Sequence, residues 1–263
     1  MSFRDRVIWV TGASSGIGEA LARQLAARGA TLILSSRREE ALDAVRQSCE
    51  RPDEHFVLPL DLADPSSLEY AAERVLDRFG HVDVMVHNGG VSQRALARDT
   101  KLSVDRRLME VDYFGAVALT KALLPSMLER GAGRFVVVSS LVGKFGTPLR
   151  SGYSAAKHAL HGFFEALAAE EHDSGVRVTM VCPGFIRTEV TLHALTADGS
   201  AQGTMDEAQD NGLSPEDCAR QIVHAIETGK REVYVAGKER FAVYVKRWFP
   251  GLFARIIRKA KVT

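Results

Sequence analysis

The stretch VIWVTGASSGIGEALARQLAARG, residues 7–29, decides the fold of this 263-residue chain. Its first part is a run of β-branched and aromatic residues, which is typical of a buried strand. After a glycine-rich turn, Leu21, Leu25 and Ala26 recur at helical spacing, and Gly29 ends the helix. A buried strand followed at once by an amphipathic helix is the repeating pattern of α/β proteins.

The turn between this strand and this helix contains Gly12, Gly16 and Gly18. Without Cβ atoms, these positions let the backbone approach a pyrophosphate group held at the N-terminus of the helix. The spacing T-G-x-x-x-G-x-G differs from the G-x-G-x-x-G of many dinucleotide-binding turns. The turn therefore indicates a bound nucleotide, and a tight strand-to-helix connection with no ligand is the alternative.

Apolar runs and helical patterns alternate along most of the chain. The further strand-like runs are ATLILSS, HFVLPLD, DVMVHNG, RFVVVSS, VRVTMVCPG and a late EVYVAG. Continuous apolar strands separated by helices predict a parallel sheet that is covered on both faces. The sequence thus predicts a single α/β domain over residues 1–263. We expect a doubly wound Rossmann-type sheet of about seven strands, with ligands at the carboxyl ends of the strands.

Composition argues against several classes of protein. Hydrophobic residues make up 46% and charged residues 25% of the chain, as in ordinary globular proteins, and no window approaches the ~18 apolar residues of a spanning helix. A formal net charge of +1 gives no field that would attract nucleic acid. Three cysteines without a C-x-x-C pair, and histidines without ligand spacing, predict neither disulfides nor a metal site. With no export leader in the first residues, we expect a cytoplasmic location.

The C-terminal extension, residues 238–263, mixes aromatic and basic residues. Its FAVYVKRWFPGLFARIIRKAKVT has the composition of a helix that lies in a membrane interface. The alternative is a terminal helix that packs on its own domain or on a partner subunit. Pro250 and Gly251 favour this alternative because they divide the stretch into two short pieces. Peripheral membrane contact through this extension stays open as the second interpretation.

The end of the second strand-like run, LILSSRREE, bears on which nucleotide is bound. Nicotinamide adenine dinucleotide (NAD) enzymes usually place an acidic residue here to bind the adenosine ribose, whereas this chain has Arg37 and Arg38. A guanidinium group suits a 2′-phosphate through charge-assisted hydrogen bonds. This pattern favours NADP(H) over NAD(H). The alternative is a solvated start of the next helix, with the arginines paired to Glu39 or Glu40.

Tyr153 and Lys157 stand four residues apart in SGYSAAKHAL, so both side chains leave one face of a helix one turn apart. Ser140 precedes Tyr153 by thirteen residues, just beyond the fifth apolar run. Alone, a Tyr and a Lys on one helix face are an ordinary solvated pair. Together with the glycine turn and HNGG at residues 87–90, the ordered set resembles the short-chain dehydrogenase/reductase family over about residues 4–237.

Further segments resemble one group within that family. NGGVSQR, DYFGAVALTKALLPSM, LTADGS and FPGLF are similar to the dehydrogenase/reductase SDR family member 7 group, including its 7B type, almost to the end of the chain. That group commonly has an N-terminal membrane anchor, which we do not expect here. The family resemblance also implies pairing through the helices that contain DYFGAVALT and YSAAKHAL, so we expect a homodimer or homotetramer.

The resemblance implies a role for each member of the set. Free tyrosine has a pKa near ~10 and exchanges protons reluctantly at neutral pH unless a cation stabilises its phenolate. Lys157 is placed to be that cation, and the family also has it bind the nicotinamide ribose. Tyr153 would exchange a proton with the substrate oxygen while the Ser140 hydroxyl holds that oxygen. The expected activity is therefore that of an NADP(H)-dependent carbonyl reductase or alcohol dehydrogenase.

The resemblance also assigns cofactor contacts position by position. LDLAD supplies the adenine contact, HNGG the ribose-proximal turn and PGFIRT the loop around the nicotinamide. HNGG departs from the commoner N-N-A-G at His87 and Gly89, but glycine allows the same backbone turn. With the glycine turn and the two arginines, the expected cofactor-binding residues are Gly12, Ser14, Ser15, Gly16, Ile17, Gly18, Arg37, Arg38, Asp61, Leu62, Asn88, Gly89, Tyr153, Lys157, Pro183, Gly184, Ile186 and Thr188.

Asp112 departs from the family pattern. LMEVDYFGAVALT, residues 108–120, reads as a buried helix that contains one acid. The family usually has an asparagine there, whose backbone kinks the helix and keeps a water on the proton relay from Lys157. An ionised carboxylate would instead favour the Lys157 ammonium. We count Asp112 with the catalytic residues Ser140, Tyr153 and Lys157 on this hypothesis, and a merely tolerated side chain is the alternative.

The substrate is less well defined by the sequence. Residues 189–212 are glycine-rich and resemble a mobile substrate lid. Nearby apolar residues predict an apolar ketone or secondary alcohol of lipid, steroid or xenobiotic type; these are Phe145, Leu149, Phe185, Leu192 and Leu195. The other class of function is a cofactor-bound sensor with little turnover on the same fold. The intact Ser140, Tyr153 and Lys157 favour the enzyme.

Overall fold

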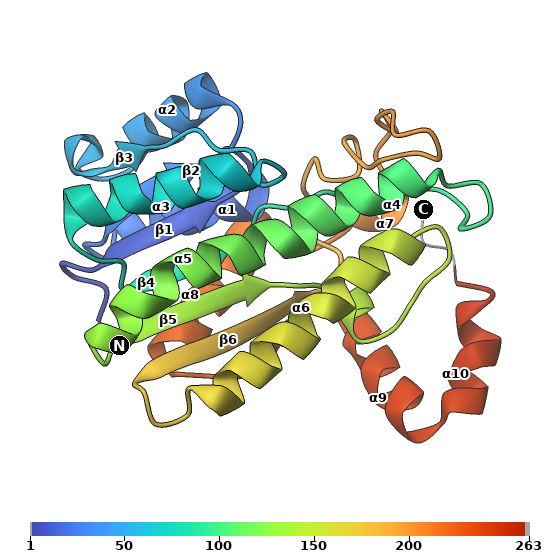
Figure 1. Ribbon diagram of the computed structural model, residues 1–263. Helices are drawn as coiled ribbons and strands as arrows, with labels where there is room; N and C mark the ends of the chain where they lie inside the picture. Colours follow the sequence, from blue (N-terminus) through green and yellow to red (C-terminus); the bar gives the residue numbers. More distant parts are fainter. Residues whose placement is uncertain (1, 261–263) are drawn as a thin grey trace.

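A parallel sheet of seven strands forms the centre of the computed structural model, which describes residues 2–260 (Figure 1). The strands are β1 (Val7–Thr11), β2 (Thr31–Ser35), β3 (Phe56–Val57), β4 (Val84–His87), β5 (Gly133–Val138), β6 (Val176–Pro183) and β7 (Glu232–Val235). Their order is β3-β2-β1-β4-β5-β6-β7, and every neighbouring pair is parallel. The doubly wound α/β fold expected from the sequence is confirmed.

Helices cover both faces of this sheet. One face carries α1 (Gly16–Ala26), α2 (Glu39–Ser48) and α8 (Pro215–Glu227). The other face carries α3 (Pro65–Phe79), α5 (Gly115–Glu129) and α6 (Ser151–Glu170). Strand β1 serves both layers, because Ile8 and Val10 pack into the first and Trp9 into the second. This burial on both faces explains why the strands are continuously apolar rather than alternating.

The chain reverses its direction across the sheet at β1. From β1 it winds outward through β2 and β3, then returns to place β4 on the other side of β1 and continues to β7. The helices that follow β1 and β4 therefore lie on opposite faces, which opens a crevice at the carboxyl ends of these two strands. Thr11 and His87 end the two strands at this crevice.

The expected helix over residues 108–120 is interrupted. Helix α4 (Leu102–Met109) passes into a π-helical turn, η2 (Glu110–Phe114), before α5 begins. The turn inserts an extra residue where Asp112 is 2% exposed and its Oδ1 accepts the backbone N–H of Val91 at 2.7 Å. Bulges of this kind are frequent at functional sites, and this one directs Asp112 toward the crevice.

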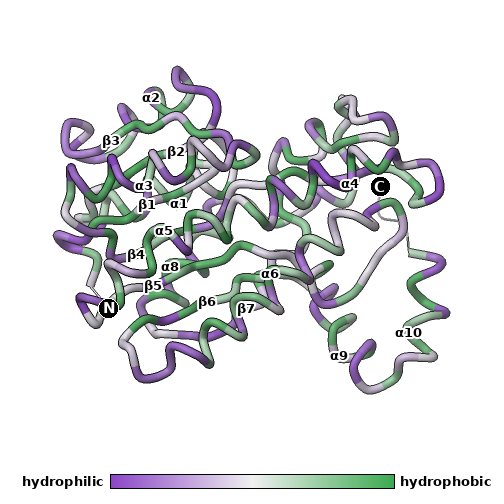
Figure 2. Tube along the Cα trace, in the orientation of Figure 1, coloured by the Kyte–Doolittle hydropathy of each residue, from purple (hydrophilic) through white to green (hydrophobic). Residues whose placement is uncertain are grey.

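The C-terminal extension forms two short helices, α9 (Phe241–Trp248) and α10 (Pro250–Ile257). They lie at the side of the molecule where α6 begins (Figure 1). The break falls at Pro250, as the sequence predicted. Figure 2 shows hydrophobic and hydrophilic residues alternating along both helices. Among the described residues, no helix has both the length and the apolar composition needed to cross a bilayer.

Candidate active site

A cavity of about 730 Å³ opens at the carboxyl ends of the strands. Most of the residues expected to bind cofactor or act in catalysis line it: Gly12, Ser14, Ser15, Gly16, Ile17, Arg37, Arg38, Asp61, Leu62, Asn88, Gly89, Ser140, Tyr153, Lys157, Pro183, Gly184, Ile186 and Thr188. Gly18 and Asp112 do not line the cavity, and each lies directly behind a residue that does. The structure thus gathers segments that are far apart in the sequence around one space.

The glycine turn needs its glycines because it bends tightly and packs closely against the segment that follows β4. Gly12 and Gly16 have φ angles of 63° and 57°, in the left-handed region that favours glycine. A Cβ on Gly12 would stand 2.8 Å from the Cα of Gly89, and one on Gly18 would overlap the carbonyl oxygen of Gly12. The side chain of Ser15 does not cap α1, so the first N–H groups of this helix can bind a phosphate.

Asn88 lines the cavity and also holds the glycine turn in place. Its Nδ2 donates to the carbonyl oxygens of Thr11 at 3.0 Å and Gly12 at 3.2 Å. The backbone N–H groups of Asn88 and Gly89 both donate to Thr11 Oγ1 at 3.1 Å. These hydrogen bonds hold the ends of β1 and β4 together, which explains why HNGG has an asparagine at residue 88.

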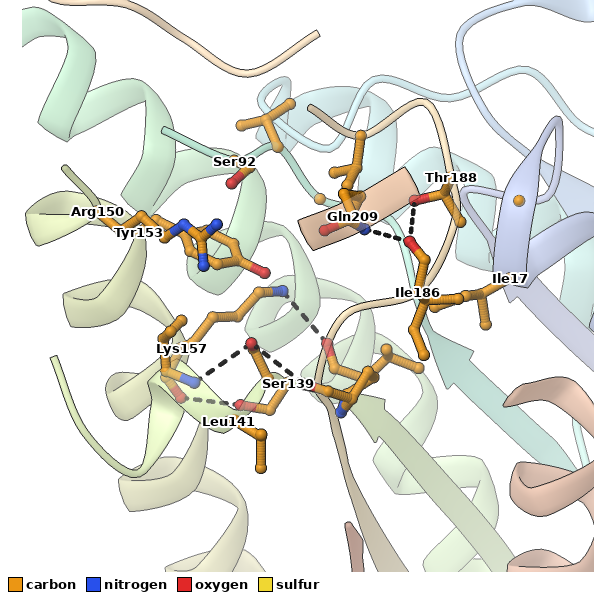
Figure 3. A pocket seen from close by; sticks show the side chains of 18 of the residues that line it. Ile17, Ser92, Ser139, Leu141, Arg150, Tyr153, Lys157, Ile186, Thr188 and Gln209 are labelled. Atoms are coloured by element: carbon orange, nitrogen blue, oxygen red, sulfur yellow. Dashed lines mark hydrogen bonds between the residues drawn. The ribbon is translucent and has the colours of Figure 1, made fainter. Parts of the chain in front are cut away.

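The loop after β6 closes the cavity from the opposite side. A Cβ on Gly16 would meet Thr188 Cγ2 at 2.9 Å, so the PGFIRT loop approaches the glycine turn closely. Gln209, from the short helix α7 (Glu207–Asp210), donates to the carbonyl oxygen of Ile186 and supports this loop (Figure 3). A dinucleotide would therefore lie between the loop and the turn.

Arg37 and Arg38 lie exposed at the end of the cavity next to β2. Arg38 Nη2 is 3.4 Å from Ser14 Oγ, so its guanidinium group lies against the glycine turn. Within residues 2–260, neither arginine forms an ion pair with Glu39 or Glu40, contrary to the alternative considered for this segment. Both cations are available to an anionic group in the cavity.

Tyr153, Lys157 and Ser140 all line the cavity. Tyr153 and Lys157 project from the same face of α6, with Lys157 Nζ 5.6 Å from the centre of the tyrosine ring (Figure 3). Ser140 Oγ lies 3.4 Å from the carbonyl oxygen of Pro183, so the fifth strand and the PGFIRT loop meet there. The neighbouring Ser139 also lines the cavity and donates to the carbonyl oxygen of Lys157 at 3.3 Å.

Asp112 and Lys157 form a buried ion pair behind this group. Their Oδ2 and Nζ atoms are 3.6 Å apart, and the two side chains are 0% and 5% exposed. Lys157 Nζ also donates to the carbonyl oxygen of Val138 at 3.2 Å. Burial raises the pKa of the Asp112 carboxyl, while the Lys157 ammonium and the Val91 N–H act against this rise. The pair places a carboxylate where the family has an amide.

His87 is a packing residue. Its Nε2 lies 2.8 Å from Thr120 Oγ1, and its ring stacks on Phe135 with centroids 6.0 Å apart. Complete burial lowers the pKa of this imidazole to about 3, so it is neutral near pH 7. The change from the family's asparagine is thus accommodated inside the core and does not alter the cavity.

Sequence reasoning missed a polar cluster on the substrate side of the cavity. Arg94 and Arg150 both line it, and both lie against the buried Asp206, with Nη2 to Oδ2 distances of 2.5 Å and 3.7 Å. Burial, followed by the nearby Arg94, lowers the pKa of Arg150 to about 10. These residues come from three distant segments, so no local pattern in the sequence indicates that they meet.

Gln93 was missed as well. Its Oε1 accepts the backbone N–H groups of Gly152 at 2.8 Å and Tyr153 at 3.2 Å, so it caps the first turn of α6 from outside the helix. Gln93 is fully buried. Its side chain therefore fixes the position from which Tyr153 enters the cavity.

Part of the expected apolar lining is corrected by the structure. Phe145 and Phe185 line the cavity, whereas Leu149, Leu192 and Leu195 do not. Leu195 instead joins residues 189–212 to the segment after β4, since it exchanges backbone hydrogen bonds with Ser92 and Arg94. The apolar wall is completed by α9 and α10, which place Ala242, Val245 and Phe253 there.

One group of potential metal ligands lies outside the cavity. Donor atoms of His161, Glu165 and Glu232 come within 4.8 Å of one another. Lys144 Nζ lies 3.6 Å from the Glu165 carboxylate and 2.5 Å from that of Glu232. The lysine ammonium thus already supplies the positive charge that these carboxylates need.

Comparisons with known proteins agree with this geometry. The short chain dehydrogenase family model matches residues 6–198. Dehydrogenase/reductase SDR family member 7B of Bos taurus is 43% identical over 97% of this chain and 81% of its own length, which confirms the resemblance to that group. Among solved structures, a short-chain dehydrogenase/reductase from Burkholderia phymatum in complex with NAD has a TM-score of 0.86 at 23% identity, over 96% of each chain.

A second solved structure is the alcohol dehydrogenase from the archaeon Thermococcus sibiricus complexed with 5-hydroxy-NADP. It has a TM-score of 0.76 at 27% identity and covers 89% of this chain and 97% of its own. Residues 6–198, which the family model matches, include the glycine turn, Ser140, Tyr153 and Lys157. This chain belongs to the short-chain dehydrogenase family of oxidoreductases.

Proposed function

We propose that this oxidoreductase uses NADP(H) to reduce the carbonyl group of an apolar substrate, or to oxidise the corresponding secondary alcohol. The observation that carries the proposal is that Tyr153, Lys157 and Ser140 line the same cavity as the glycine turn and two arginines. The uncapped N–H groups at the start of α1 suit a pyrophosphate, and Arg37 and Arg38 suit a 2′-phosphate.

The glycine turn and the PGFIRT loop would hold the dinucleotide, whose nicotinamide would supply the hydride chemistry. The Tyr153 hydroxyl gives its proton to the substrate oxygen, and the Ser140 hydroxyl donates a hydrogen bond to the same oxygen. The Lys157 ammonium, 5.6 Å from the tyrosine ring, stabilises the phenolate that remains. All three groups act at one oxygen atom, which places the reacting carbonyl beside Tyr153.

Asp112 acts through Lys157 in this proposal. Its carboxylate keeps the ammonium charged and oriented, since the pair is buried and separated by 3.6 Å. The negative charge also offsets part of the positive potential that Lys157 creates at Tyr153. Asp112 is therefore a positioning residue, and its effect should be visible in the pH dependence of the reaction.

Replacing Asp112 by Asn should shift the pH–rate profile. The Asn side chain keeps the size of Asp and can still accept the Val91 N–H, but it removes the negative charge. Without this charge, Tyr153 loses its proton more readily, and the midpoint of the rising limb for alcohol oxidation should move by about one pH unit to lower pH. The measurement is kcat/KM against pH.

Glu110→Gln is the control for this prediction. It removes an acid from the same π-helical turn but outside the cavity, and it should leave the pH–rate profile unchanged. Unchanged turnover and an unchanged profile in Asp112→Asn would exclude the electrostatic role.

The substrate class follows from the walls around Tyr153. Phe145, Phe185, Val245 and Phe253 form an apolar surface, which a lipid, steroid or xenobiotic ketone would cover. Residues 189–212 form the lid over this region in the proposal. Their hydrogen bonds to the segment after β4 give the lid a defined closed position.

Assembly and compartment are part of the same proposal. We expect a homodimer or homotetramer formed through α5 and α6, and the half-exposed Phe114 just before α5 supports an apolar contact there. The cytoplasm is the proposed compartment. Its support is that Cys49, Cys182 and Cys218 are all buried and unpaired, as expected in a reducing environment.

The test is a titration of the purified protein with NADPH and with NADH, followed by turnover assays with apolar ketones and aldehydes. We expect tighter binding of NADPH and reduction of at least one ketone, measured by the loss of NADPH absorbance. Binding of NADPH without turnover of any carbonyl would contradict the reductase proposal and favour the sensor. A preference for NADH would contradict the assignment of Arg37 and Arg38.

A further inference from the structure

Helix α9 has an apolar stripe on each of two faces. Ala242 and Val245 face inward and pack beside Phe253 and Phe145. Phe241, Tyr244 and Trp248 recur at helical spacing on another face, where they are 56%, 50% and 72% exposed. A surface helix of a globular protein normally places polar residues there. Tyr244 contacts the ring of Tyr234, with centroids 6.3 Å apart, but all three residues of this outer stripe remain at least 50% exposed.

The outer stripe continues onto α10. Phe253 is buried against Phe145 with ring centroids 5.3 Å apart, so this side of the helix is attached to the domain. Phe249, Leu252 and Ile256 follow one another at the next helical positions and are 51–62% exposed. The six outer residues of the two helices form what we call the outer apolar face: Phe241, Tyr244, Trp248, Phe249, Leu252 and Ile256.

Positive charge surrounds the outer apolar face. Residues 238–260 contain seven basic side chains, all exposed: Lys238, Arg240, Lys246, Arg247, Arg255, Arg258 and Lys259. The one acid of this segment, Glu239, faces the protein body, where its carboxylate accepts the N–H groups of Gly237 and Phe185. The excess of six positive charges contrasts with the formal net charge of +1 for the whole chain, so the remainder is net negative. Lys261 lies outside the described residues.

We propose that the outer apolar face docks onto a lipid bilayer that contains anionic phospholipids. Exposed aromatic and aliphatic residues enter the boundary between headgroups and acyl chains, and flanking Lys and Arg side chains bind the lipid phosphates. Charge argues against a second copy of this chain as the occupant, because two such faces would bring six excess positive charges on each side together. It fits an anionic surface that also has an apolar interior.

The position of this face gives docking a consequence for the cavity. Ile256 is 52% exposed and also lines the cavity, as do Val245 and Phe253 on the inner side of the same helices. An apolar path therefore leads from the docked face to the cavity that contains Tyr153. An apolar substrate could then enter from the bilayer without crossing water. This last step rests on the proposed reductase function, whereas docking itself does not.

The chain has a built-in reporter for the test. Its two tryptophans are Trp9, which is completely buried in the sheet, and Trp248, which is 72% exposed on the outer apolar face. The full chain is mixed with vesicles of phosphatidylcholine alone, or of equal parts phosphatidylcholine and phosphatidylglycerol, without cofactor or substrate. We expect flotation with the anionic vesicles only, a blue shift of Trp248 emission and quenching by brominated acyl chains. Trp248→Phe should still float but lose the shift.

Two paired variants separate the contributions. Arg247→Glu with Arg255→Glu should weaken partition into anionic vesicles at least about 30-fold, given the usual contribution of each basic residue near such a surface. The matched control, Arg98→Glu with Lys230→Glu, reverses two exposed charges on other parts of the chain and should bind as the unchanged protein does. Trp248→Ser with Phe249→Ser should float poorly while retaining its fold, because both side chains are exposed.

Several results would overturn the docking proposal. These are no flotation with anionic vesicles, flotation with an unshifted Trp248, and equal binding by the charge-reversed protein. A concentration-dependent dimer that Trp248→Ser with Phe249→Ser dissociates, without vesicle binding, would assign the face to a second copy instead. Because vesicle binding is measured without turnover, its failure leaves the proposed function untouched. Failure of the enzyme assay likewise leaves docking untouched.

Discussion

Tyr153→Phe should reduce kcat for carbonyl reduction by about 1,000-fold, within the ~10² to 10⁴ range that general acid–base catalysis contributes. Phenylalanine keeps the ring that lies 5.6 Å from Lys157 Nζ and removes the hydroxyl alone. The substrate oxygen then receives no proton as hydride arrives, while the hydrogen bond from Ser140 remains. The measurement is the single-turnover rate of NADPH oxidation at saturating substrate.

Binding of NADPH separates this loss from misfolding. Tyr153→Phe removes one hydroxyl group and leaves the glycine turn, Arg37 and Arg38 in place, so the Kd for NADPH should change far less than kcat. Tyr70→Phe is the matched control, because Tyr70 is an exposed residue of α3 and loses the same hydroxyl group. It should retain full activity. If Tyr153→Phe kept most of its kcat, another group would have to supply the proton.

The fold was predictable because its signals are local and repeated. Each buried strand is a short apolar run, and each crossover helix brings its own spacing and its own end signal, as with Gly29 after α1. Right-handed crossover connections then limit the ways in which such units can form one parallel sheet. The C-terminal break at Pro250 was also local, since proline cannot continue the hydrogen bonds of a preceding helix.

The site was predictable only where a family pattern could be matched. Tyr153 and Lys157 share a helix face because they are four residues apart. The glycine turn could be recognised because the backbone there has no room for Cβ atoms. Gln93 gives no such signal, because it acts on α6 from a segment 59 residues away. Arg94 and Arg150 meet Asp206 across 112 and 56 residues, and composition says nothing about such contacts. Non-local polar pairs of this kind need the folded backbone to be recognised.

Asp112 shows the same limit from another side. The sequence identified an acid in a buried helix, but the π-helical turn that directs it to Lys157 is a property of the backbone. The apolar lining was misjudged for a related reason. Leu149 is near Tyr153 in sequence, and Leu192 and Leu195 belong to the lid. The apolar wall is instead completed by α9 and α10, and α9 begins 88 residues after Tyr153.

Replacing both Arg37 and Arg38 by Ala should raise the KM for NADPH about 100-fold and leave the KM for NADH nearly unchanged. Each guanidinium would lose a charge-assisted hydrogen bond to the 2′-phosphate, and a pair of such bonds accounts for an effect of about this size. Arg38 lies against Ser14 of the glycine turn, and Arg37 is exposed beside it, so the single variants should each lose part of the effect. NADH lacks the phosphate and therefore loses no contact in the double variant.

The measurement is kcat/KM for both cofactors with one ketone, at low and at high salt. Binding of NADPH by the unchanged protein should weaken as the salt concentration rises. The double variant should show a much smaller effect, because salt screens the same charges that it lacks. Arg98→Ala, at an 81% exposed side chain, is the control and should keep the preference for NADPH. Equal loss for NADH and NADPH in the double variant would mean that the arginines support the turn itself rather than recognise the phosphate.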